Sequence, residues 1–172
     1  LLIVGRVHEQ KGHDLLAKAL ADLSSDTLSK VLLICVGFSG GWAEKIFEEM
    51  DLSNHVTFRG ETFPLPYYQC SDLMVLPSRY EGFPITCVEA MACGLPIIRS
   101  QAGGFADQIE EGINGFSFPI NDSGKIARFI EQLSNEPEQR AFLSQGARTI
   151  AMQRFDSRNS FAILQTTITG TK

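Results

Sequence analysis

The stretch LLIVGRVHEQKG, residues 1–12, opens the sequence and decides its fold class. Its first part is short and apolar, as a buried β-strand is. A loop bounded by Gly5 and Gly12 follows, and apolar residues then recur at helical spacing, at Leu15, Leu16, Ala19, Leu20 and Leu23. A strand, a tight loop and a helix in this order form the repeating unit of an α/β protein with a parallel sheet.

The same alternation continues along the chain. Short apolar runs rich in Val and Ile predict six buried strands, at 1–5, 30–36, 56–59, 73–77, 96–100 and 115–119. Parallel strands are joined by right-handed crossovers, so we expect a Rossmann-like doubly wound sheet with helices on both faces. The strand order that we predict is 3-2-1-4-5-6, the common one for such a sheet.

Helical spacing of apolar residues marks the segments between and after these strands. The predicted helices and their buried residues are one with Ile46, Phe47 and Met50; one after a cap at Asp122 or Ser123, with Ile126, Phe129, Ile130 and Leu133; one from Pro137, with Phe142, Leu143, Ala147 and Ile150; and one after Asp156, with Phe161, Leu164 and Ile168.

Length and composition favour one compact domain over residues 1–172, in which 44% hydrophobic residues are enough for a core. The net charge of −5, without a block of like charges, argues against nucleic acid as a partner. The longest apolar run, Val31 to Val36, is far too short to span a bilayer. The chain has no signal peptide and opens inside a strand, so we expect it to have been cut from a longer protein.

Neither the cysteines nor the histidines suggest a bound metal. The four cysteines, at 35, 70, 87 and 93, form no Cys-x-x-Cys pair and have apolar neighbours, which predicts buried free thiols in a reducing compartment. The three histidines are scattered, and no Asp-x-Asp occurs. No metal or other resident cofactor is therefore predicted.

The predicted strand order places a ligand over the carboxyl ends of strands one and four. The loop after strand one carries Arg6 and Lys11 between its two glycines. Glycine lets a ligand approach the backbone closely, and the helix start offers free N–H groups to an anion. A guanidinium grips a phosphate in a planar fork and an ammonium adds a point charge, so the pair suits a diphosphate. Two solvated cations beside a turn are the alternative.

The loop after strand four carries Glu81, and the helix predicted from Pro84 to Gly94 carries Glu89. We expect Ile85, Val88 and Ala92 to form the buried stripe of that helix, with Glu89 on the same side. A carboxylate in such surroundings needs donors or a cleft, so both acids are predicted to face the ligand. The alternative for Glu89 is a place at the margin of the stripe, in contact with solvent or an arginine.

Paired glycines, Gly103 and Gly104, follow strand five and precede another helix. They predict an amide-rich rim beside the anion site, although an ordinary turn between strand and helix would read the same way.

Taken together, these motifs resemble the retaining glycosyltransferases of the GT-B fold, family GT4. The resemblance covers essentially the whole chain, in the family's order. It rests on Gly5-Arg6, Lys11-Gly12, the Glu-x7-Glu element of Glu81 and Glu89, Gly103-Gly104 and Asn114-Gly115. It implies that the chain is one half of a GT-B fold, the C-terminal half that binds the nucleotide-sugar donor.

The resemblance also implies roles for single residues. Arg6 and Lys11 would hold the donor diphosphate, beside Gly5, and stabilise its charge as it leaves. Glu89 would accept hydrogen bonds from the ribose hydroxyls, and Glu81 would contact the donor sugar. The remaining donor-binding residues that it implies are Gly82, Phe83, Arg59, Gly60, Gly103 and Gly104, with Arg59 and Gly60 bordering the base. Among these residues, Arg6, Lys11 and Glu81 would take part in catalysis.

The reaction that the resemblance implies is sugar transfer from a nucleotide-diphosphate sugar with retention of anomeric configuration. The acceptor, a saccharide or a lipid-linked one, would bind to an N-terminal domain that this chain lacks, so that the chain alone would be inactive or nearly so. The implied location is cytoplasmic, with peripheral association at the inner membrane as an alternative for the full-length protein.

Other functions are weighed on the same residues. A hydrolase with paired carboxylates would use Glu81 and Glu89 but has no use for a diphosphate clamp. A dehydrogenase would want Gly-x-Gly-x-x-Gly after strand one, which is absent. A non-catalytic module that binds a nucleotide sugar, or serves as a scaffold, remains the alternative.

Overall fold

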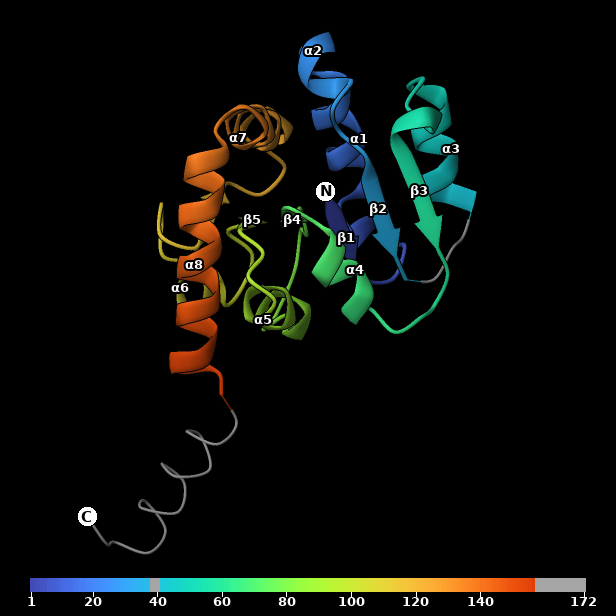
Figure 1. The fold of residues 1–172 in the computed structure, drawn as a ribbon. Helices are drawn as coiled ribbons and strands as arrows, with labels where there is room; N and C mark the ends of the chain where they lie inside the picture. Colours follow the sequence, from blue (N-terminus) through green and yellow to red (C-terminus); the bar gives the residue numbers. More distant parts are fainter. Residues whose placement is uncertain (38–40, 157–172) are drawn as a thin grey trace, which may run out of the picture.

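A computed structural model describes residues 1–37 and 41–156, which form an α/β domain with a central sheet (Figure 1). The sheet has six strands in the order β3-β2-β1-β4-β5-β6, and every neighbouring pair is parallel. Its strands are β1 (Leu2–Val4), β2 (Leu33–Val36), β3 (Val56–Arg59), β4 (Met74–Leu76), β5 (Ile97–Ser100) and β6 (Gly115–Phe118). The predicted order 3-2-1-4-5-6 and doubly wound fold are confirmed.

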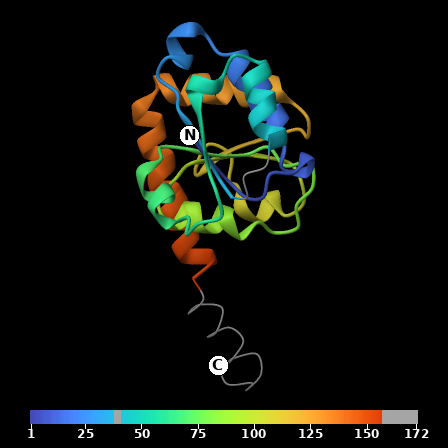
Figure 2. The ribbon, with the colours of Figure 1, turned by 90° about the vertical axis from the view of Figure 1, so that its right-hand side faces the viewer.

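Helices cover both faces of this sheet, as Figure 2 shows from the side. They are α1 (His13–Ala21), α2 (Ser25–Leu28), α3 (Gly41–Glu49), α4 (Leu65–Cys70), α5 (Ile85–Ala92), α6 (Phe105–Gln108), α7 (Ser123–Asn135) and α8 (Pro137–Arg154), with short 3₁₀ turns at η1 (Glu9–Lys11) and η2 (Ser53–His55). The core is split by the sheet. Ile3 packs with α1, α3 and α7 on one face, and its neighbours Leu2 and Val4 pack with α5 and α8 on the other.

Most of the predicted elements are present. The stripe of α1 is buried throughout, and the carboxylate of Asp122 caps α7 by accepting a hydrogen bond from the backbone N–H of Lys125, 2.9 Å away. The short helices α2 and α4 were not predicted. The helix predicted after Asp156, with Phe161, Leu164 and Ile168, lies outside the described residues.

The buried stripe predicted for α5 is wrong. Ile85 is 61% exposed, and the helix instead buries Cys87, Ala90 and Met91. The helix is apolar on nearly every side, so its periodicity cannot show which side meets the sheet. Glu89 therefore shares an exposed face with Ile85 rather than a buried one.

Two smaller expectations also need correction. Phe142 of α8 is 59% exposed, whereas Leu143 beside it is fully buried. All four cysteines are free, as predicted, but Cys70 is exposed because it ends the short helix α4 at the surface. No helix in the described part of the chain is long and apolar enough to cross a bilayer.

Candidate functional site

The loops that follow β1 and β4 lie directly against each other. The backbone N–H of Arg79 donates to the carbonyl of Gln10 at 2.7 Å, and the amide of Gln10 donates to the carbonyl of Tyr80 at 2.8 Å. Gly12 has a φ of 72°, and a Cβ there would lie 2.2 Å from the carbonyl oxygen of Pro77. Glycine is required at this position both for its backbone conformation and for the close contact between the loops.

An ion pair fastens the same two loops to α1. The guanidinium of Arg79 contacts both carboxylate oxygens of Asp14, at 2.8 and 2.7 Å, and also donates to the carbonyl of Glu9 at 2.6 Å. The bond from Arg79 lowers the pKa of the Asp14 carboxyl below its ordinary value. The cation-bearing loop is thus held at a fixed place relative to β4.

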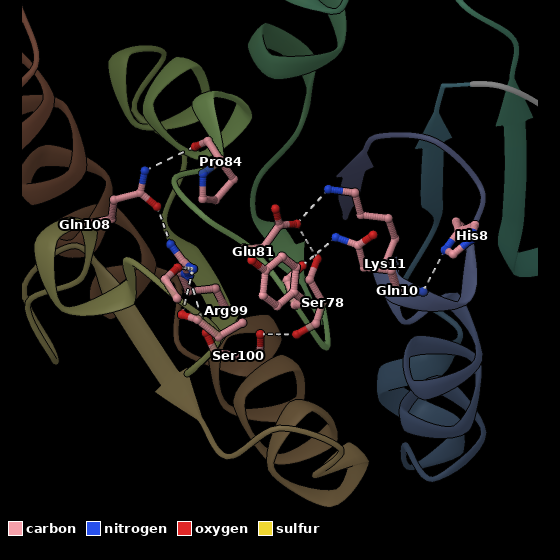
Figure 3. A network of polar contacts seen from close by, with 12 residues as sticks. His8, Gln10, Lys11, Ser78, Glu81, Pro84, Arg99, Ser100 and Gln108 are labelled. Atoms are coloured by element: carbon pink, nitrogen blue, oxygen red, sulfur yellow. Dashed lines mark hydrogen bonds and ion pairs between the residues drawn. The ribbon is translucent and has the colours of Figure 1, made fainter.

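Lys11 and Glu81 point toward one another across this junction (Figure 3). The Nζ of Lys11 lies 2.6 Å from Oε1 of Glu81, and the same oxygen accepts a hydrogen bond of 2.7 Å from the Oγ of Ser78. The two charged side chains are 23% and 9% exposed. The prediction that the loops after strands one and four bring a cation and an acid together is confirmed, and Ser78 joins them as a residue that the sequence did not single out.

Arg6 and Gly5 stand at the carboxyl end of β1, beside this pair. Arg6 is exposed, and within residues 1–37 and 41–156 its guanidinium has no hydrogen bond or ion pair. A Cβ added at Gly5 would lie 3.5 Å from Cε of Lys11, so the lysine stem runs past Gly5. Arg6 therefore extends from the same edge of the sheet as the ammonium of Lys11, with its donors open to a ligand.

Glu89 lies on the exposed side of α5, where its hydrogen-bond partner is Tyr68. Its Oε2 accepts a hydrogen bond of 2.8 Å from the hydroxyl of Tyr68, which belongs to α4 and is only 2% exposed. Burial and the contact with Glu89 both raise the pKa of Tyr68, so the phenol stays a donor. Tyr68 holds one carboxylate oxygen and leaves the other free to accept further hydrogen bonds.

Gly103 and Gly104 lie behind the loop of Glu81, Gly82 and Phe83. A Cβ at Gly103 would lie 2.4 Å from the carbonyl oxygen of Glu81, and one at Gly104 would lie 2.4 Å from that of Gly82. The paired glycines are therefore explained by backbone packing, which brings the loops after β4 and β5 into contact. Gly82 and Phe83 are exposed beside them.

Arg59 and Gly60 lie at the carboxyl end of β3, and both are exposed. β3 is two strands away from β1, which places them on the order of 10 Å from the first loop. The backbone N–H of Gly37, after β2, donates to the carbonyl of Arg59 at 3.1 Å. Arg59 and Gly60 share an edge of the sheet with Lys11 and Glu81 but do not touch that pair. This placement suits contact with the far end of an elongated ligand.

Two buried polar residues near the site were not predicted. His13, at the start of α1, is 1% exposed, and its Nδ1 has no partner among the described atoms. Burial lowers its pKa to about 4, so the imidazole is neutral. Arg99 is 1% exposed within β5. An arginine inside a run predicted as a buried strand was the signal that could have drawn attention to it.

Comparison with known proteins shows the family of this chain. Residues 1–150 match the family described as "Glycosyl transferases group 1". The chain belongs to this family. It is 31% identical to a D-inositol 3-phosphate glycosyltransferase of Saccharomonospora viridis over 93% of its own length, which is 40% of that protein.

One of the solved structures with the same fold holds a nucleotide. HepE of Anabaena in complex with UDP superposes with a TM-score of 0.89 at 27% identity, over 98% of this chain and 48% of that one. The sucrose-phosphate synthase of Thermosynechococcus elongatus gives a TM-score of 0.85 at 25% identity, over 99% of this chain and 46% of that one. The chain thus spans less than half the length of these relatives.

Within the described residues, no three His, Cys, Asp or Glu side chains lie together as metal ligands would.

Proposed function

We propose that this chain is a single domain that binds the nucleotide-diphosphate sugar of a retaining glycosyltransferase over the carboxyl ends of β1 and β4. The observation that carries the proposal is the 2.6 Å contact between Nζ of Lys11 and Oε1 of Glu81. It joins a cation and an acid at the point where the strand order reverses, which is where sheets of this kind bind ligands.

Each part of the donor has a matching group at this edge. Arg6 and Lys11, next to Gly5, bind the diphosphate, and the free oxygen of Glu89 accepts from the ribose hydroxyls. Glu81, with the backbone of Gly82 and Phe83, contacts the sugar, and Arg59 and Gly60 border the base. Gly103 and Gly104 support the loop that contacts the sugar. Their close approach to the carbonyls of residues 81 and 82 is consistent with this role.

The chemistry follows from charge. Breaking the bond between the sugar and the diphosphate places negative charge on the phosphate and positive charge on the sugar ring. Fixed cations at the phosphate stabilise this transition state, and one missing donor costs about 3–4 kcal/mol at comparable sites. The acceptor attacks from the face that the diphosphate leaves, so we assign no general base. We assign no resident metal because the sequence has no Asp-x-Asp.

Sugar transfer itself is proposed for a longer protein in which a second domain binds a saccharide or lipid-linked acceptor. The proposal is supported by the relatives, of which this chain spans 40% and 48% in the two cases above. A cytoplasmic location is part of the proposal and is supported by the four free cysteines. Peripheral association with the inner membrane is the alternative location for the longer protein.

Calorimetric titration of the chain with UDP-, GDP- and ADP-glucose, and with UDP alone, tests donor binding. UDP is included because the related HepE was solved with it. We expect saturable binding of at least one of these sugars, at one site. Absence of binding by all of them would refute the proposal, and a longer protein that binds a donor but transfers no sugar would favour a non-catalytic module.

A further inference from the structure

Arg99 is a buried cation whose hydrogen-bond partners, among the residues described, are all neutral oxygens. Its Nη2 donates to the carbonyls of Gly103 at 2.9 Å and Ala102 at 3.2 Å, and Nη1 donates to the side-chain carbonyl of Gln108. None of the ion pairs in the described part of the chain includes Arg99. Burying a guanidinium among neutral oxygens is costly unless each donor is used, so these contacts fix its position closely.

Gln108 carries the connection across to the neighbouring loop. It is fully buried, and its amide donates to the carbonyl of Pro84 at 3.1 Å while its own carbonyl faces Arg99 (Figure 3). Pro84 directly follows Gly82 and Phe83 in the loop after β4. Arg99 and Gln108 therefore form a two-residue polar bridge from Gly103, behind that loop, to Pro84 at its end.

Both ends of the bridge bear on the loop that is proposed to meet the sugar. Gly103 touches the carbonyl of Glu81, and Pro84 ends the segment that begins at Glu81. Within the described residues, neither Arg99 nor Gln108 forms a hydrogen bond or ion pair with Lys11 or Glu89. The bridge thus acts on one part of the site and leaves the diphosphate and ribose positions to other contacts.

We propose that Arg99 and Gln108 are positioning residues that set the sugar loop, residues 81–84, for the sugar of the donor. The inference rests on the proposed function, because it assigns this loop to the sugar. Loosening the bridge lets the loop sample other positions, and binding must then order it again. Affinity for the nucleotide sugar falls while affinity for the nucleotide alone is kept.

Gln108→Glu is the sharpest test because it removes the donor to Pro84 and keeps Arg99 bound, now through an ion pair. Glutamate has the same shape and keeps an oxygen facing Arg99, but an ionised carboxylate has no hydrogen to donate to the carbonyl of Pro84. Gln145→Glu, an exposed position on α8, is the matched control for the added charge. Arg99→Lys is a second variant that keeps the charge and loses the planar fork.

The experiment titrates each form of the chain with UDP-glucose and with UDP, after a thermal melt shows that it is folded. We expect Gln108→Glu to weaken UDP-glucose binding about tenfold and to change UDP binding by less than about twofold. Gln145→Glu should bind both as the unchanged chain does, and a folded Arg99→Lys should show the same selective loss as Gln108→Glu.

The outcomes separate this inference from the proposed function. Equal loss of UDP and UDP-glucose, or no loss, in folded Gln108→Glu would overturn the positioning role while the donor site stands. If the unchanged chain binds none of UDP, UDP-glucose, GDP-glucose and ADP-glucose, the proposed function is refuted, and this inference is refuted with it.

Discussion

Replacing Lys11 with methionine is expected to weaken diphosphate binding by roughly 10- to 30-fold in Kd. Methionine keeps the length and apolar stem of the side chain and removes its charge. A hydrogen bond to a charged group contributes about 1.5–3 kcal/mol. Because the side chain of Lys11 is 23% exposed, and because Glu81 already occupies its Nζ at 2.6 Å in the free chain, the lower half of that range applies, about 1.5–2 kcal/mol.

Calorimetry with three ligands locates the loss. Lys11→Met should weaken UDP and pyrophosphate by similar factors and leave any binding of uridine unchanged, since uridine lacks the phosphates. Lys18→Met, an exposed position on α1, controls for the loss of one positive charge. Unchanged affinity for UDP and pyrophosphate in a folded Lys11→Met chain, or equal losses in both lysine variants, would refute a direct contact between Lys11 and the diphosphate.

The other predictions concern neighbouring residues. Glu81→Gln removes the acid that holds Lys11, so pyrophosphate should bind at least as tightly as before, while the affinity difference between UDP-glucose and UDP should shrink. Titration with the three ligands measures both effects, and weaker pyrophosphate binding would contradict a competition between Glu81 and pyrophosphate for Lys11. Glu89→Ala should weaken UDP more than pyrophosphate, and equal losses would contradict the ribose assignment. Gly103→Ala places a Cβ 2.4 Å from a backbone oxygen and should reduce UDP-glucose affinity and melting temperature, unlike Gly124→Ala, whose added Cβ meets only an ordinary contact at 3.6 Å. Burial lowers the pKa of His13 from 6.5 to about 4. The free energy of unfolding should therefore be highest above pH 6.5 and should fall by about 3 kcal/mol as the pH drops from 6.5 to 4, because the folded chain resists protonation of this imidazole. In urea unfolding across this pH range, His13→Leu should lose less stability than the unchanged chain. Identical pH profiles for the two chains would contradict this role of His13.

The sequence predicted the sheet well because its signals are local. Each buried parallel strand is a short apolar run, and β3 has the predicted bounds 56–59. The adjacency of Lys11 and Glu81 followed from strand order, since the loops after β1 and β4 must meet where that order reverses.

What the sequence could not predict depends on contacts between distant residues. The helix α5 is apolar on most sides, so only the sheet and α8 decide that Cys87 is buried and Ile85 exposed. Tyr68 meets Glu89 from α4, a six-residue helix too short for a periodic pattern. Arg99 finds two of its acceptors on the backbone of the loop that follows its own strand, and a third on the side chain of Gln108 in α6, which no side-chain motif can indicate.

A crystal structure of the chain with UDP-glucose tests the central claim most directly. The account predicts a diphosphate within hydrogen-bond distance of Nζ of Lys11 and the guanidinium of Arg6, with ribose hydroxyls on the carboxylate of Glu89. A nucleotide sugar bound elsewhere, such as in the recess between α5 and α8 lined by Cys93 and Arg148, would contradict it.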